Sequence, residues 1–155
     1  MIKIMFICHG NICRSPMAEF IMKDLITKKN LDNYFYITSK ATSNEEYGNP
    51  IHYETKNILE KENIYYDKNK RASKVTKEDY NNYDYFIVMD DNNLKNISYI
   101  FNDTDNKVYK LLTFNSQNKD IEDPWYTGDF EKTYEDVTLG CTNFLEYLIK
   151  KYNLK

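Results

Sequence analysis

A cysteine and an arginine separated by five residues stand near the start of the chain. Cys8 ends an apolar run and Arg14 precedes a run with helical spacing, so both belong to a loop between a strand and a helix. Backbone N–H groups at a helix start, together with a guanidinium, can bind a tetrahedral phosphate dianion. A thiol in such positive surroundings favours the thiolate form. The spacing therefore predicts attack of sulfur on phosphorus, with Cys8 as nucleophile and Arg14 as phosphate ligand.

The residues around this pair support the same interpretation. Ser15 is expected to cap the helix, and Pro16 is expected to take the first helical position. Asn11 suits the left-handed backbone of a tight loop. Ser15 can also donate its hydroxyl to the Cys8 thiolate. A cysteine and an arginine at this spacing can occur by chance, but their agreement with a strand, a loop and a helix start favours a phosphate site.

The run from Cys8 to Pro16 resembles the signature Cys-x-Gly-Asn-x-Cys-Arg-Ser-Pro of the low-molecular-weight protein tyrosine phosphatases. The resemblance implies a flavodoxin-like fold and hydrolysis of phosphotyrosine through a phosphocysteine intermediate, with no metal or other cofactor. It also implies that Asn11 holds the loop through its side chain, with Ser39 as partner. The other loop residues are then expected to bind the phosphate or the substrate: His9, Gly10, Ile12 and Cys13.

A second part of the chemistry is predicted in the run Glu122-Asp123-Pro124-Trp125-Tyr126. Expulsion of a phenoxide is assisted by a carboxylic acid that protonates the leaving oxygen. The resembling family carries its general acid in an Asp-Pro-aromatic-aromatic motif, which Asp123 matches. Trp125 and Tyr126 would then hold an aryl phosphate by stacking. In the alternative interpretation, Asp123 is only a turn residue before proline and one of the aromatic rings packs on the C-terminal helix.

Three departures from the family pattern concern the surroundings of the site. The family's Ser-Ala-Gly-Thr is replaced by Ser39-Lys40-Ala41-Thr42, and Glu45-Glu46 stands where an aromatic residue is common. Lys70 aligns with a histidine of the family. We therefore expect a more acidic entrance and a different network behind Asn11.

Alternating patterns predict a three-layer α/β fold with a central four-stranded parallel sheet. The expected strands are 2–8, 34–39, 83–89 and 107–112, and the expected helices are 15–29, 51–63, 91–101 and 129–152. Residues 1–155 are expected to form a single domain. In such sheets the active site lies beyond the strand carboxyl ends, where Cys8 and the long loop 115–128 are expected to meet.

The composition limits the partners and the compartment. A net charge of −3 argues against nucleic acid, and the chain has no apolar run long enough for a membrane span. Three cysteines and no signal segment indicate a reducing cytoplasm, and no second Cys or His cluster completes a metal site. We expect a monomer or weak dimer that acts on tyrosine-phosphorylated proteins and is redox-sensitive through a Cys8–Cys13 disulfide.

Individual residues distinguish three other functions that a loop of this kind could have. A protein arginine phosphatase tends to place Thr where this chain has Ile12. An arsenate reductase needs two further relay cysteines in the middle of the chain, and residues 14–140 contain no cysteine. A non-catalytic phosphate-binding module would not need the combination of Cys8, Arg14 and Asp123. Tyrosine phosphatase activity is therefore the leading prediction, with arginine phosphatase and the binding module as alternatives.

Overall fold

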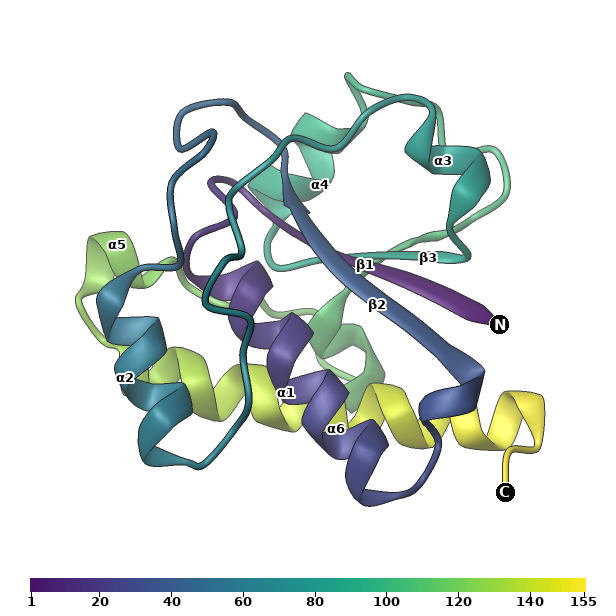
Figure 1. Ribbon diagram of the computed structural model, residues 1–155. Coiled ribbons are helices and arrows are strands. Elements are labelled where there is room, and N and C mark those ends of the chain that lie inside the picture. The colour runs from purple at the N-terminus through teal and green to yellow at the C-terminus, as the bar shows by residue number, and fades with distance from the viewer.

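Four parallel strands form a sheet in the order β2-β1-β3-β4. They are β1 (Ile2–Cys8), β2 (Phe35–Ala41), β3 (Tyr85–Val88) and β4 (Val108–Lys110). The computed structural model describes residues 1–155, and Figure 1 shows the sheet between layers of helices. This arrangement confirms the predicted flavodoxin-like α/β fold. Because β1 and β3 are neighbours, the residues that follow them meet at one edge of the sheet.

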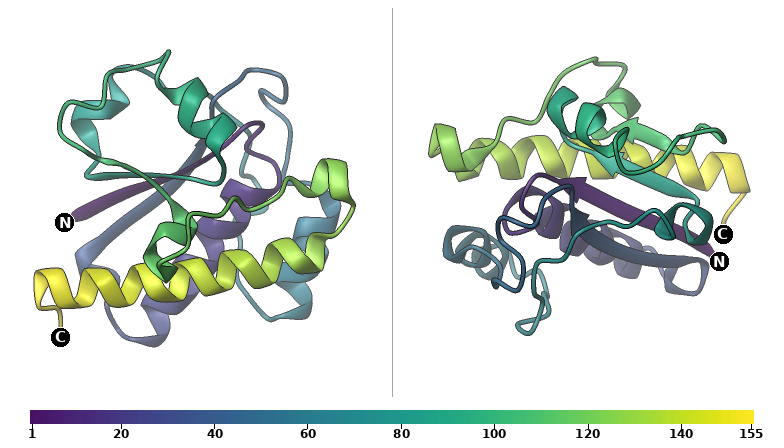
Figure 2. Two further views of the ribbon diagram at one scale, coloured as in Figure 1. Left: turned by 180° about the vertical axis from the view of Figure 1, so that it is seen from behind. Right: turned by 90° about the horizontal axis from the view of Figure 1, so that it is seen from above.

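Helices cover both faces of the sheet (Figures 1 and 2). One face packs on α1 (Arg14–Lys28) and the long α6 (Phe130–Tyr152), with α2 (Tyr53–Lys61) beside α6. The other face is covered by α3 (Asp79–Asn82) and α4 (Asp91–Ile97). No helix of the structure combines the length and the apolar character needed to cross a bilayer.

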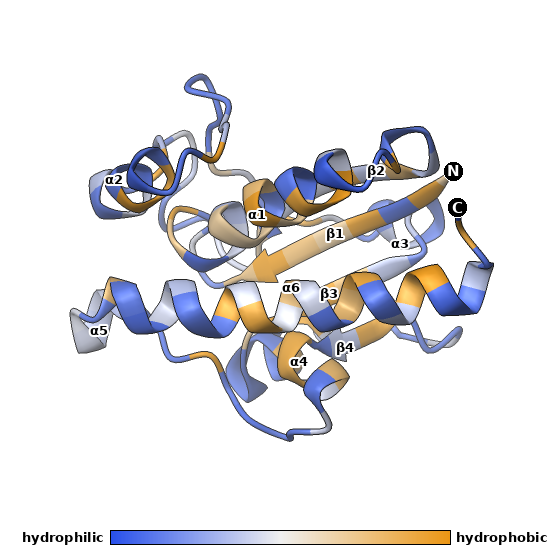
Figure 3. Ribbon diagram, turned by 90° about the horizontal axis from the view of Figure 1, so that it is seen from below, coloured by the Kyte–Doolittle hydropathy of each residue, from blue (hydrophilic) through white to orange (hydrophobic).

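The side chains of β1 alternate between two cores. Ile4 and Phe6 belong to a large core with residues of α1 and α6, whereas Met5 and Ile7 belong to a smaller core with residues such as Tyr80 of α3. Figure 3 shows the apolar character of β1 and the mixed character of α6, which buries one side only. Burial on both faces holds β1 rigidly, so its last residue, Cys8, is presented from a fixed support.

Short elements account for most differences from the sequence-based prediction. The 3-10 turn η1 (Asp32–Tyr34), the helix α3 and the helix α5 (Pro124–Thr127) have too few residues for a detectable period. The helix predicted to reach residue 101 ends at Ile97, and the long loop expected at 115–128 contains α5.

The fourth strand is shorter than predicted for a reason visible in its packing. After Lys110 the chain enters the 3-10 turn η2 (Leu111–Asn115), where Leu111 and Leu112 are buried against α6 instead of in the sheet. Phe114 of this turn lies with its ring centroid 4.4 Å from that of Phe144. An apolar run therefore indicated burial correctly but not the strand.

Gly140 of α6 gives a prediction about this contact. A Cβ added at Gly140 would lie 2.5 Å from Cγ of Leu111, which is fully buried. On an open helix, Gly→Ala raises the free energy of unfolding by about 1 kcal/mol. Here Gly140→Ala should instead lower it by about 1–3 kcal/mol, because the core is overpacked. Urea unfolding measures the change.

The control is the same substitution in a Leu111→Ala background. That background removes the atoms that would collide, so Gly140→Ala should no longer be destabilising there. A gain in stability from Gly140→Ala in the otherwise unchanged protein would contradict the expected collision.

Candidate active site

The loop between β1 and α1 folds back over the Cys8 sulfur. Asn11 has a φ of 62°, in the left-handed region, and its backbone N–H donates to Cys8 Sγ at 3.2 Å. The Ser15 hydroxyl lies 3.0 Å from the same sulfur. Cys8 is only 3% exposed, so these two groups supply most of its polar surroundings. Both groups can donate a hydrogen bond to a thiolate, which stabilises the charged form.

Neighbouring segments bind the loop from outside. Backbone N–H groups of Thr42, Ser43 and His52 donate to the carbonyl oxygens of Cys8, His9 and Ile12, respectively. In a trans peptide the carbonyl and the following N–H point in opposite directions. The N–H groups that follow these three carbonyls are therefore turned toward the concave side of the loop, where they can bind an anion: those of His9, Gly10 and Cys13.

Ser15 does not cap α1, so this part of the prediction is wrong. The helix begins at Arg14, Cys13 holds the N-cap position without a side-chain cap, and Pro16 is the third helical residue. The Ser15 hydroxyl is buried and lies against Cys8 and Asn11 instead. The two roles predicted for Ser15 compete for one hydroxyl, and the contact with the sulfur takes precedence.

Asn11 links the loop to the sheet. Its Nδ2 donates to Ser15 Oγ at 2.8 Å and to Ser39 Oγ at 3.0 Å, and its Oδ1 accepts from the backbone N–H of Ser73 at 3.3 Å. Asn11 and Ser39 are 28 residues apart in sequence but in contact, as the family resemblance implied. These bonds hold Asn11 in its left-handed conformation.

A buried ion pair lies behind Ser39. Ser39 Oγ donates to Glu19 Oε1 at 2.6 Å, and Lys70 Nζ lies 3.3 Å from the same oxygen. Lys70 also donates to the carbonyl oxygen of Ser39 at 2.7 Å. Lys70 therefore supports Ser39 and Glu19, without contacting Asn11 directly. The sequence analysis missed Glu19, although an acid four residues after Ser15 on a buried helix face was the available signal.

Arg14 is the most constrained charged residue of the site. It is 2% exposed, and its Nη1 donates to Asp90 Oδ2 at 2.5 Å and to the Ile121 carbonyl oxygen at 2.8 Å. Burial opposes the charge, but Cys8 and Asp90 raise the pKa of Arg14 above its ordinary value. Asp90 was not predicted from sequence. Its position two residues after the end of β3 is the signal that could have found it, because β3 ends beside β1.

Asp123 reaches the same guanidinium from the other side of the site. Its Oδ2 lies 3.4 Å from Arg14 Nη2, and its Oδ1 accepts from the Trp125 backbone N–H at 3.0 Å. Asp123 thus caps α5, as the turn interpretation requires, and also lies beside the phosphate loop. With a side chain 23% exposed, it can reach a bound ligand.

A cavity of about 130 Å³ opens above Cys8. A cavity of about 150 Å³ can hold benzene, so the volume suits one aromatic head group. The cavity unites every loop and aromatic residue predicted to contact substrate, and it adds two glutamates: Cys8, His9, Gly10, Ile12, Cys13, Arg14, Glu45, Glu46, Asp123, Trp125 and Tyr126. Asn11, Ser15 and Ser39 form the support behind Cys8 and do not line it.

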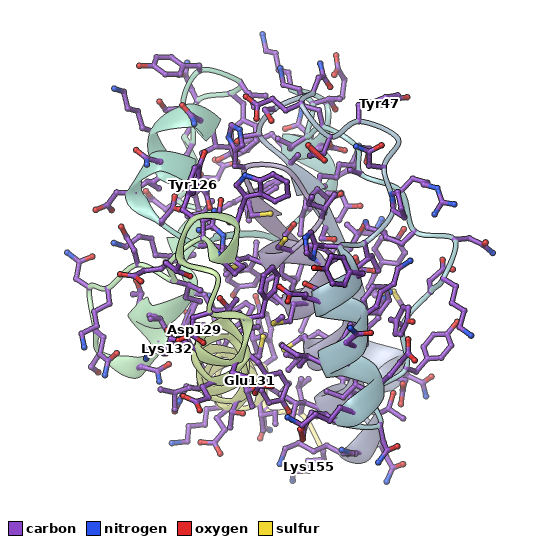
Figure 4. All side chains as sticks on the ribbon, turned by 90° about the vertical axis from the view of Figure 1, so that its left-hand side faces the viewer. Tyr47, Tyr126, Asp129, Glu131, Lys132 and Lys155 are labelled. Carbon is purple, nitrogen blue, oxygen red and sulfur yellow. The ribbon has the colours of Figure 1, made fainter.

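The rim of the cavity is aromatic on one side and acidic on the other. Trp125 is 60% exposed and Tyr126 is 83% exposed, so both rings are available to a ligand. Figure 4 shows Tyr126 on α5 and Tyr47 on the loop after β2, well apart on this end of the molecule. Glu45 lies 2.8 Å from His9 Nε2. The acidic rim expected from Glu45-Glu46 is therefore present, and Tyr47 does not replace an aromatic wall there.

Cys13 is a second sulfur in the same cavity but in a different state. Burial, and then the nearby Cys8 sulfur, raise the pKa of the Cys13 thiol well above its ordinary value. Cys13 therefore remains protonated and cannot compete with Cys8 as a nucleophile. All three cysteines are free.

Comparisons with known proteins agree with this geometry. The model of the low molecular weight phosphotyrosine protein phosphatase family matches residues 3–154. The low molecular weight protein-tyrosine-phosphatase PtpA of Staphylococcus haemolyticus is 39% identical over 156 residues, covering 100% of this chain and 99% of that protein. The structure of YfkJ from Bacillus subtilis has a TM-score of 0.93 and 35% identity, covering 97% of this chain and 96% of that one. A low molecular weight protein tyrosine phosphatase from Streptococcus pyogenes has a TM-score of 0.86 and 43% identity, covering 99% and 97% of the two chains.

Proposed function

Because the chain belongs to the low molecular weight phosphotyrosine protein phosphatase family, we propose that it hydrolyses phosphotyrosine in proteins through a phosphocysteine intermediate on Cys8. The observation that carries the proposal is one cavity with Cys8 at its floor, Arg14 beside it, and Asp123 within 3.4 Å of that arginine. These three residues supply a nucleophile, a phosphate ligand and a proton donor.

In the first step the Cys8 thiolate attacks phosphorus, and the bond from phosphorus to the phenolic oxygen breaks. Arg14 and the inward N–H groups of the loop bind the nonbridging phosphate oxygens. Asp123, as the carboxylic acid, protonates the leaving phenolic oxygen.

In the second step water attacks phosphorus, and the sulfur–phosphorus bond breaks to return the Cys8 thiolate and inorganic phosphate. Asp123, now a carboxylate, accepts the proton of the attacking water. Ser15 and the Asn11 N–H stabilise the departing thiolate by donating hydrogen bonds to it. The same donors therefore assist the sulfur as nucleophile and as leaving group.

The surroundings suit a phenyl ring. Ile12 offers an apolar wall, and Trp125 and Tyr126 offer exposed rings on the rim. We further propose that the protein acts in a reducing cytoplasm, because the Cys8 thiolate must remain unoxidised to act. We also propose that it is a monomer or weak dimer.

The leaving group tests the role of Asp123. Asp123→Asn should reduce kcat for phosphotyrosine about 100-fold or more, because tyrosine leaves poorly without a proton. Hydrolysis of p-nitrophenyl phosphate should fall far less, since p-nitrophenolate leaves unaided. Steady-state kinetics without added metal measures both, and Cys8→Ser, which lacks the thiolate, should abolish both.

Two outcomes would contradict this assignment. Equal losses of kcat on the two substrates would show that Asp123 only caps α5 and is not the proton donor. Turnover above about a tenth of wild type in Cys8→Ser would exclude the covalent mechanism, and absence of any turnover in the wild type would favour a phosphate-binding module.

Ile12 separates the tyrosine from the arginine alternative. An apolar wall leaves the donors of a phosphorylated guanidinium unpaired, which costs roughly 1–3 kcal/mol. Ile12→Thr adds a hydroxyl acceptor with little change in shape. We expect the wild type to prefer phosphotyrosine in kcat/KM and the variant to shift toward phosphoarginine by about ten-fold or more. A wild type that prefers phosphoarginine would favour the alternative function.

The two sulfurs of the cavity predict reversible inactivation by oxidation. Peroxide that enters the cavity should convert the Cys8 thiolate to a sulfenic acid, which then condenses with the Cys13 thiol and releases water. Mild peroxide should therefore produce an 8–13 disulfide that dithiothreitol reverses. Peptide mass spectrometry detects it, and Cys13→Ser should instead be over-oxidised at Cys8. Equal recovery of activity in Cys13→Ser and wild type would argue that Cys13 is only a packing residue.

A further inference from the structure

Lys110, the last residue of β4, is a buried cation with two carboxylate partners. Its side chain is 5% exposed, and its Nζ donates to Asp91 Oδ1 and to Asp120 Oδ1, both at 2.9 Å. Burial alone would lower the pKa of Lys110, but the hydrogen bonds to Asp91 and Asp120 raise it above its ordinary value. Lys110 is therefore charged and joins two segments that are distant in sequence.

Each of these carboxylates stands next to a group that holds Arg14. Asp91 follows Asp90, which accepts from the guanidinium at 2.5 Å. Asp120 precedes Ile121, whose carbonyl oxygen accepts from the same nitrogen at 2.8 Å. The backbone N–H of Asp91 also donates to Asp120 Oδ1 at 3.1 Å, which closes the contact between the two segments.

Asp120 is the point where an exposed stretch of chain returns to the sheet. Residues 116–119 are exposed, and Asp120 is held by Lys110 and by the start of α4. The next residue, Ile121, is fully buried and its N–H donates to the Met89 carbonyl oxygen at 2.8 Å. Asp123 follows two residues later, so its placement depends on this attachment.

We propose that Lys110 is a positioning residue, which fixes the Asp120–Asp123 segment against the start of α4 and so holds Asp123 over the phosphate loop. The proposal rests on the proposed function for its effect on rate. Lys110 does not line the cavity above Cys8 and does not contact Arg14. It acts only through its hydrogen bonds to Asp91 and Asp120.

Replacement of Lys110 should leave the fold intact. The side chains of Asp91 and Asp120 are 72% and 43% exposed, so water can hydrate both carboxylates when the lysine is absent. Methionine fills the space of the lysine stem without a buried charge. We therefore expect Lys110 replacement to disturb the position of the Asp120–Asp123 segment without unfolding the protein.

The variant is Lys110→Met, and the matched control is Lys107→Met, which lies just before β4. Lys107 Nζ donates to the Tyr80 carbonyl oxygen at 2.7 Å, remote from Arg14. Lys110→Met should reduce kcat for phosphotyrosine about ten-fold and kcat for p-nitrophenyl phosphate less than about three-fold. Lys107→Met should change the ratio of the two rates little. Lys110→Arg should restore most of the ratio, because a guanidinium can also bridge two carboxylates.

Hydrogen exchange of the Ile121 amide gives a readout that does not depend on activity. Lys110→Met should accelerate its exchange about ten-fold or more, whereas Lys107→Met should not. Unchanged exchange in Lys110→Met, or equal losses on both substrates, would overturn the proposal. A wild type without phosphotyrosine turnover would instead contradict the proposed function, while the exchange measurement would still decide the role of Lys110.

Discussion

The buried guanidinium of Arg14 is the interaction on which the site depends. A guanidinium that is 2% exposed has lost its hydration, and a buried charge without a partner is costly. Arg14 must therefore be paired within the protein. Asp90 and the Ile121 carbonyl oxygen meet this requirement from two segments, 76 and 107 residues further along the chain. The order β2-β1-β3-β4 makes the pairing possible, because it brings the end of β3 beside the end of β1. The need to pair one arginine thus joins the phosphate loop to both later parts of the fold.

The nucleophile has a separate support on the opposite side of the loop. From Cys8, contacts run through Ser15 and Asn11 to Ser39, and from Ser39 to the buried Glu19. Every polar group in this series has a hydrogen-bond partner, and these bonds hold the left-handed backbone of Asn11 in place. At the far end Glu19 is paired with two lysines, Lys23 at 2.7 Å and Lys70 at 3.3 Å. Lys70 also donates to the Ser39 carbonyl oxygen, so one side chain supports both the acid and the serine.

Sequence reasoning reached the parts of this molecule that depend on neighbours in the chain. The spacing of Cys8 and Arg14 and the motif at Asp123 identified residues that the structure gathers in one cavity. The apolar runs likewise predicted the parallel sheet. Asp90 and Glu19 were missed although their positions after β3 and on the buried face of α1 offered a signal, because their partners are distant in sequence. Lys110 was missed because a lone lysine carries no pattern of its own. Helices of four residues, such as α3 and α5, are too short to show a period.

The separation of Arg14 from Asp123 has a consequence for the protein's synthesis. The two residues are 109 positions apart, which corresponds to roughly 5 to 20 seconds of translation at about 5–20 residues per second. During that interval the emerging chain carries Cys8 and Arg14, and it gains Asp90, the first partner of the guanidinium, before Ile121 and Asp123 are made. The phosphate loop therefore cannot take its final form on the ribosome until the segment around Asp123 has been made. A nascent chain that ends before Ile121 leaves the Arg14 guanidinium only partly paired, so the complete site forms only after most of the sequence has been synthesised.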